Sequence, residues 1–314
     1  MSTLELLRST TPVLRVHDSG LIGPDASPYS SCQAGGVSRD EPYALIADDA
    51  ELVGVNLETG ELHRHKLRGE STPKSIVGLT GRRFVVVSIL DAHMYDLADG
   101  KLRLLREWDE FNSGGSVLQV AATPDASRIA IAAGDRVWEG SVKRKKLTSV
   151  IRRHKELSRY AVALSDDGQT LVCGGPGGAT VHTGRPPGPT TEVRFPDSTD
   201  IPLLATGLSP DGELLAVGDD ITRTALCDLS TGDLRPLDTS GKAIAIDWLP
   251  DGSGFAVVTL TREIYVFDRE GQPVAVAGHP DSGTRYFYAG GWLPDGTGLW
   301  AATEHGLIVT WNFA

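Results

Sequence analysis

Short hydrophobic runs alternate with polar turn sequences along almost the whole chain. In one stretch, AIAIDWL and FAVVTL flank a Pro-Asp-Gly, EIYVFD follows after a short polar turn, and QPVAVAG comes after REG. Each run is short, rich in β-branched or aromatic residues, and bounded by turn residues, which is typical of strands rather than helices. The stretch therefore predicts a unit of four antiparallel strands.

The Pro-Asp-Gly sequence has the chemistry of a tight hairpin turn. Proline presets φ, aspartate can accept a hydrogen bond from the backbone ahead of it, and glycine takes the positive φ that other residues resist. The turn recurs around seven positions, the first two being weaker copies: Asp40, Gly81, Asp125, Asp167, Asp211, Asp251 and Asp295. The last five follow one another at separations of 42, 44, 40 and 44 residues, so the pattern predicts seven equivalent units.

A second turn recurs after the third run of several units, as LETGEL, LADGKL, LSTGDL and DREGQP. Two turn types in a fixed order make a chance repeat improbable. A lone four-stranded sheet exposes both faces, whereas radial packing of such sheets covers the faces and leaves only short edges. The sequence therefore predicts an all-β fold, a single seven-bladed β-propeller domain over residues 1–314, which is consistent with its 36 glycines and 18 prolines.

The last unit supplies only three hydrophobic runs, YAGGWL, LWAATE and LIVTWNF, before the chain stops. Its outer strand must come from elsewhere. The segment TPVLRVH at residues 11–17 precedes the first unit and has a suitable composition, so we expect it to complete the seventh blade and close the ring.

These motifs resemble the WD-repeat propeller family over nearly the whole chain. The resemblance rests on the SPDG turn, on the third strands that end in MYD, LCD and VFD, on the TG that follows, and on AGH at 277–279 and the terminal TWN. Most units lack the Gly-His that opens a family repeat, and none has the Trp-Asp dipeptide. The resemblance implies the propeller fold and an interaction scaffold that binds a protein or peptide on one face.

Candidate catalytic residues are hard to find. His93, His182 and His305 fall near the second turn or third strand of their units, but no HExxH motif or cysteine pair fixes a metal site. The aspartates of the repeated turn are explained by turn geometry. We expect no catalytic residue, no metal and no cofactor. The alternative is a propeller enzyme, a lactonase-like hydrolase or a lyase, with polar groups converging on the mouth of the channel.

The connections between blades offer candidate binding residues. Large aromatics beside Arg or Gly in exposed loops have the composition of binding hot spots. The candidates are Trp108, Phe111, Arg285, Tyr286 and Phe287, and inward anchoring of a loop by the same aromatics is the alternative.

A basic run, KRKKLTSVIRRHKE, interrupts an otherwise acidic chain. It provides Arg152, Arg153 and Lys155 as a candidate docking patch for an acidic partner, and a solvated strand edge is the alternative. The net charge of −11 makes nucleic acid an improbable partner.

The remaining expectations concern location and assembly. No stretch approaches the roughly 20 apolar residues of a membrane helix, and the N-terminal sequence lacks the apolar run of a secretory signal. We expect a cytoplasmic protein without membrane contact, and the sequence leaves its oligomeric state and the identity of its partner open.

Overall fold

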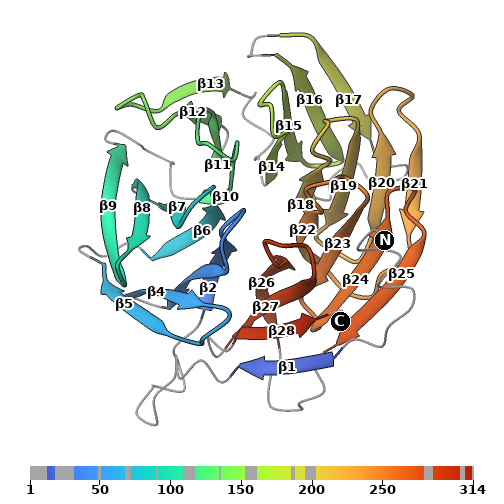
Figure 1. Cartoon of the computed structure of the whole chain (residues 1–314). Coiled ribbons are helices and arrows are strands. Elements are labelled where there is room, and N and C mark those ends of the chain that lie inside the picture. Colours follow the sequence, from blue (N-terminus) through green and yellow to red (C-terminus); the bar gives the residue numbers. More distant parts are fainter. Residues whose placement is uncertain are drawn as a thin grey trace.

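A computed structural model describes most of the chain. The described residues are 13–17, 32–48, 51–67, 72–89, 91–108, 117–133, 136–152, 161–184, 188–194, 203–278, 286–304 and 308–312. They form 28 strands in seven four-stranded antiparallel sheets, arranged as blades around a central channel (Figure 1). The seven-bladed propeller predicted from the repeat is thereby confirmed. No helix in the described residues is long and apolar enough to cross a membrane.

The first four blades follow the chain from the inner strand outward. Blade 1 contains β2 (Cys32–Val37), β3 (Tyr43–Asp48), β4 (Glu51–Asn56) and β5 (Leu62–Lys66). Blade 2 contains β6 (Pro73–Gly78), β7 (Arg83–Ser88), β8 (Ala92–Ala98) and β9 (Lys101–Trp108). Blade 3 contains β10 (Val117–Ala122), β11 (Ile129–Ala133), β12 (Arg136–Gly140) and β13 (Thr148–Arg152). Blade 4 contains β14 (Ala161–Leu164), β15 (Thr170–Gly175), β16 (Gly178–Thr183) and β17 (Thr190–Arg194).

The next two blades repeat this order, and the seventh has a different outer strand. Blade 5 contains β18 (Leu203–Leu208), β19 (Leu214–Asp219), β20 (Thr224–Asp228) and β21 (Leu234–Leu237). Blade 6 contains β22 (Ala243–Trp248), β23 (Gly254–Thr259), β24 (Glu263–Asp268) and β25 (Pro273–Gly278). Blade 7 contains β26 (Phe287–Trp292), β27 (Gly298–Thr303) and β28 (Ile308–Asn312), with β1 (Val13–His17) outside them.

The ring closes where β1 joins the last blade. This strand pairs antiparallel with β28, from Val13 opposite Asn312 to His17 opposite Ile308. In Figure 1 the blue β1 lies beside the red β28. The two ends of the chain therefore share one sheet, as the missing fourth run of the last unit predicts.

The turn between the first and second strands of a blade has the expected geometry. In blade 4, Asp167 Oδ1 accepts hydrogen bonds from Ser165 Oγ at 2.6 Å and from the Gln169 backbone N–H at 2.8 Å. Gly168 has the φ of 67° that the turn requires. Blade 3 places Ala126 at this point with a φ of 57°, and the alanine is fully buried.

The hydrophobic core lies between neighbouring blades rather than within one sheet. One cluster of buried side chains joins Val85 and Met94 of blade 2 to Val120 and Ile131 of blade 3. Because every blade is covered on both faces, its middle strands are apolar on both sides. The inner strands line the channel, and their side chains determine which chemical groups face it.

Candidate functional site

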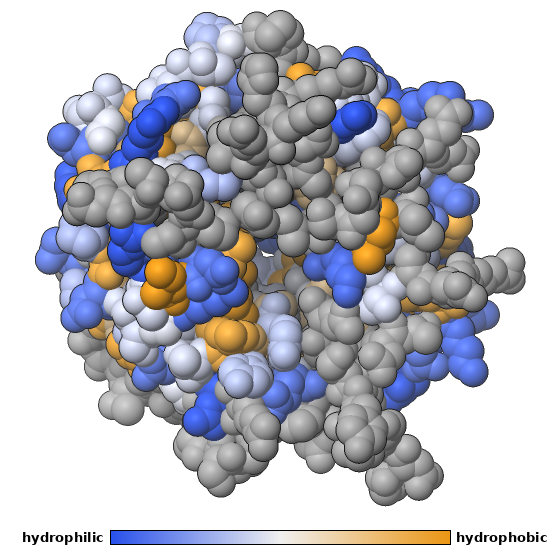
Figure 2. All heavy atoms as spheres, turned by 180° about the vertical axis from the view of Figure 1, so that it is seen from behind, coloured by the Kyte–Doolittle hydropathy of each residue, from blue (hydrophilic) through white to orange (hydrophobic). Residues whose placement is uncertain are grey.

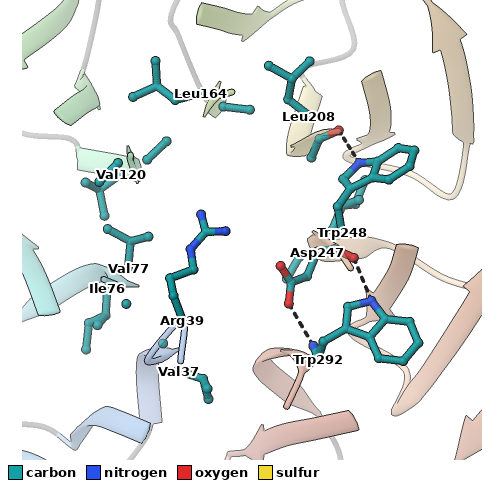
Figure 3. A pocket seen from close by; sticks show the side chains of 18 of the residues that line it. Val37, Arg39, Ile76, Val77, Val120, Leu164, Leu208, Asp247, Trp248 and Trp292 are labelled. Atoms are coloured by element: carbon teal, nitrogen blue, oxygen red, sulfur yellow. Dashed lines mark hydrogen bonds between the residues drawn. The ribbon is translucent and has the colours of Figure 1, made fainter. Parts of the chain in front are cut away.

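A cavity of about 240 Å³ occupies one end of the central channel. Parts of the inner strands of all seven blades, together with several of the first turns that follow them, line it. We call this the turn end of the channel, and the opposite end, where the inner strands begin, the connection end. The cavity wall combines polar groups with apolar side chains, among them Val77, Val120, Leu164 and Leu208 (Figure 3).

Three charged side chains in this cavity depart from the repeat. Four residues before the turn aspartate or its equivalent, blade 6 has Asp247, whereas the other blades have glycine, alanine or valine. One residue before the turn, four blades have proline, but blade 1 has Arg39 and blade 4 has Asp166. These three charges therefore stand out from the repeat pattern.

Asp247 is held in place by the neighbouring blade. Its Oδ2 accepts a 2.8 Å hydrogen bond from the backbone N–H of Trp292, and the carboxylate lies over Gly291, where a Cβ would come within 2.9 Å of the carboxyl carbon. Burial raises the pKa of this carboxyl, against the hydrogen bond from Trp292 and the positive charge of Arg39. The side chain remains partly accessible from the cavity.

Arg39 extends into the cavity from blade 1, which blade 7 separates from the blade of Asp247. Figure 3 shows its guanidinium directed into the open space, with the Asp247 carboxylate facing it from the other side. Its Nη1 lies 3.6 Å from Asp166 Oδ1, and both side chains are about one-third exposed. The Arg39 backbone N–H donates to the Leu79 carbonyl at 3.0 Å, which fixes the base of the side chain against blade 2.

Two tryptophans stabilise the wall next to Asp247. Trp248 Nε1 donates to the Gly207 carbonyl at 3.0 Å, and Trp292 Nε1 donates to the Asp247 carbonyl at 3.2 Å. Each indole thus bonds the inner strand of the preceding blade. The Asp247 carboxylate therefore projects from a wall in which hydrogen bonds join blade 6 to blade 5 and to blade 7.

The described residues do not assemble a metal site. No group of three or more His, Cys, Asp or Glu side chains among them is placed to hold an ion. His93 lies between Asp91 and Glu107, with ring nitrogens 3.6 Å from each carboxylate, and His182 is buried. His305 lies outside the described residues. The described cavity lining includes neither histidine nor cysteine.

The predicted binding aromatics divide into buried and exposed residues. Trp108 and Phe287 are 1% and 0% exposed, and Trp108 Nε1 donates to the Arg144 carbonyl at 3.0 Å. The structure thus places these two as inward anchors, the alternative to an exposed binding role. Tyr286 is 40% exposed. Outside the described part of the chain lie Phe111, Arg285, Arg153 and Lys155, and of Arg152 only the backbone, at the end of β13, is described.

Exposed hydrophobic side chains occur at the connection end of blades 5 and 7. Tyr286 and Tyr288 stand at the start of β26, and Ile221 lies in the turn between β19 and β20. Antiparallel pairing places that turn on the same face as the start of the inner strands. Seen from behind, in Figure 2, hydrophobic atoms lie beside the central opening.

Sequence reasoning missed Arg39, Asp166 and Asp247. The signal was present, because aligning the seven turns shows a charge where the equivalent positions are small, apolar or proline. What the alignment could not show is that the three side chains point into one cavity. No protein-family model matches the chain, and no curated protein matches it either.

Proposed function

We propose that this protein is a non-enzymatic interaction scaffold of the WD-repeat type. It would bind a protein or peptide partner on the face of the propeller at the connection end of the channel. The observation that carries the proposal is the set of exposed hydrophobic residues there, Ile221, Tyr286 and Tyr288. Tyrosine is enriched among binding hot spots because it combines a large apolar surface with a hydroxyl group.

The loop that carries Ile221 is preorganised. Buried Asp219 accepts hydrogen bonds through Oδ1 from the backbone N–H groups of Ile221 and Arg223, both at 2.9 Å, and Arg223 Nε donates to its Oδ2 at 2.6 Å. The Ile221 side chain is nevertheless 54% exposed. A rigid loop that presents an isoleucine to solvent loses little entropy on binding, which favours recognition.

A backbone hydrogen bond and a buried neighbouring residue hold the backbone of the two tyrosines in place. The Tyr286 carbonyl accepts a 3.1 Å hydrogen bond from the Glu304 N–H, and Phe287, the next residue, is fully buried beside Trp311. The pairing of β26 with β27 shifts register between Phe287 and Ala289, and the intervening Tyr288 is exposed. Two aromatic side chains therefore flank one buried anchor on a rigid strand.

Affinity capture followed by quantitative binding tests this proposal. A partner captured by the unaltered chain is identified by mass spectrometry, and its affinity is measured for Tyr286→Ser and Ile221→Ser. We expect each change to weaken binding by at least about 1 kcal/mol, a factor of about five, with an unchanged melting curve.

Leu104 on β9 provides the matched control, because it is 51% exposed but belongs to the outer strand of blade 2. Leu104→Ser should leave the affinity unchanged. Equal affinity for all three variants would refute the proposed face, and a loss confined to Leu104→Ser would move the interface to the outer strands. Turnover of a lactone, sugar or ester by the purified chain would refute the scaffold proposal and support the alternative of a propeller enzyme.

A further inference from the structure

The cavity at the turn end contains groups that the proposed scaffold function does not use. Arg39, Asp166 and Asp247 come from blades 1, 4 and 6, and all three line the same space of about 240 Å³. We propose that this cavity binds a small amino-carboxylate, a molecule with one carboxylate and one protonated amine, between Arg39 and Asp247. This site lies at the other end of the channel from the proposed partner interface and does not depend on it.

Arg39 is suited to the carboxylate of such a ligand. A guanidinium has five N–H donors in a planar fork that matches a carboxylate. Within the described part of the chain, this guanidinium makes one ion pair, with Asp166 at 3.6 Å, which is longer than a hydrogen bond. Its donors are thus open toward the cavity, as Figure 3 shows.

Asp247 is suited to the amine. Its Oδ2 is bonded to the Trp292 N–H, whereas its Oδ1 has no hydrogen-bond partner among the described residues. A carboxylate placed deep in a protein is costly unless a cation or several donors compensate for its lost hydration. A protonated amine in the cavity would supply both the positive charge and the missing donor.

The cavity is large enough for a small zwitterion. An apolar cavity of about 150 Å³ already holds benzene in another protein, so about 240 Å³ accommodates a small amino acid. Val77, Val120 and Leu164 contribute an apolar wall on the side of the cavity away from Asp247. That wall suits the carbon skeleton of the ligand, while the two ends fix its orientation.

Isothermal titration calorimetry on the full chain tests the proposal. The probes are glycine, L-alanine and γ-aminobutyrate, with acetate and methylamine as controls that carry only one of the two charges. We expect at least one amino-carboxylate to bind with a dissociation constant of about 1 mM or tighter, and both controls to bind at least about tenfold more weakly. Failure of all three amino-carboxylates to bind, or equal binding of a control, overturns the proposal.

Variants then assign the two ends of the site. Asp247→Asn keeps an acceptor for the Trp292 N–H and removes the negative charge. Arg39→Gln removes the guanidinium group from a side chain that is one-third exposed. Each should weaken binding by about tenfold or more. Arg64→Gln is the matched control, since Arg64 pairs with Glu51 on the surface of the same blade as Arg39. Unchanged affinity in folded Asp247→Asn and Arg39→Gln would show that the ligand binds elsewhere.

Discussion

Trp292 of blade 7 makes two hydrogen bonds to Asp247 of blade 6, from its backbone N–H to Oδ2 at 2.8 Å and from its indole Nε1 to the carbonyl at 3.2 Å. The inner strand of each blade is a sheet edge, so some of its N–H groups have no strand partner. Other blades solve this in the same way: Ser75 Oγ accepts from the Val120 N–H, and Gln119 Oε1 accepts from the Val162 N–H, both at 3.0 Å. Side chains of one inner strand thus complete the backbone hydrogen bonding of the next.

Asp247→Asn should stabilise the protein at neutral pH. Burial raises the pKa of this carboxyl in the folded state, so the folded protein binds the proton more tightly than the unfolded chain. The free energy of unfolding therefore falls as pH rises through the interval between the unfolded and the folded pKa. Thermal denaturation of the variant and the unaltered chain should differ most at neutral pH and converge below the ordinary aspartate pKa of about 3.9. A variant that melts lower at neutral pH would contradict this.

Asp167 should show the opposite dependence. Hydrogen bonds from Ser165 Oγ and from the Gln169 N–H lower its pKa, so its contribution to stability is present above the unfolded pKa and is lost as pH falls through the folded pKa. Asp167→Ala should lower the free energy of unfolding by about 0.5–1 kcal/mol at neutral pH, since the carboxylate is exposed and screened by water. Urea denaturation checks this, and a cost that persists unchanged at acidic pH would contradict it.

The ion pair between Arg128 and Glu139 should be the most costly to break. Both residues are buried, Arg128 Nε lies 3.2 Å from Glu139 Oε1, and Arg128 Nη1 reaches the Gly168 carbonyl in blade 4. Glu139→Ala leaves an uncompensated buried charge, so we expect urea denaturation to show a loss of about 3–5 kcal/mol.

The exposed pair of Arg194 and Glu192 is the control for this effect. Its groups are 2.7 Å apart but largely in solvent, so Glu192→Ala should cost less than about 1 kcal/mol. Similar losses in the two variants would show that burial of the first pair does not determine its strength.

Removal of β1 should open the ring. Deletion of residues 1–17 leaves β28 as an unpaired outer edge of blade 7, so we expect a lower melting temperature and aggregation by edge pairing. Deletion of residues 1–12 keeps β1 and should have little effect. Melting curves and light scattering distinguish the two, and identical curves for both deletions would count against closure by β1.

The blades and their turns could be predicted because the information is local and repeated. The Asp-Gly of the repeated turn needs a positive φ at the glycine, and Gly168, Gly212, Gly252 and Gly296 all adopt it. The missing fourth run of the last unit likewise indicated the strand at Val13–His17. A signal that recurs at a fixed period identifies the fold without any long-range contact.

The orientation of single side chains could not be predicted in this way. Trp108 and Tyr286 have the same kind of sequence neighbourhood at a blade connection, yet one is buried against blade 3 and the other is exposed. Which of them faces the core depends on the volume that the adjacent blade leaves open. That volume is set by side chains of another unit.

The sequence by itself determined seven four-stranded units, the positions of their turns and the strand that closes the ring, since each depends on residues a few positions apart. Only the tertiary structure decided that Arg39, Asp166 and Asp247 meet in one cavity. They belong to three blades, and the circular arrangement of the blades directs equivalent positions toward one axis. Charges that are distant in the chain become neighbours because the ring closes.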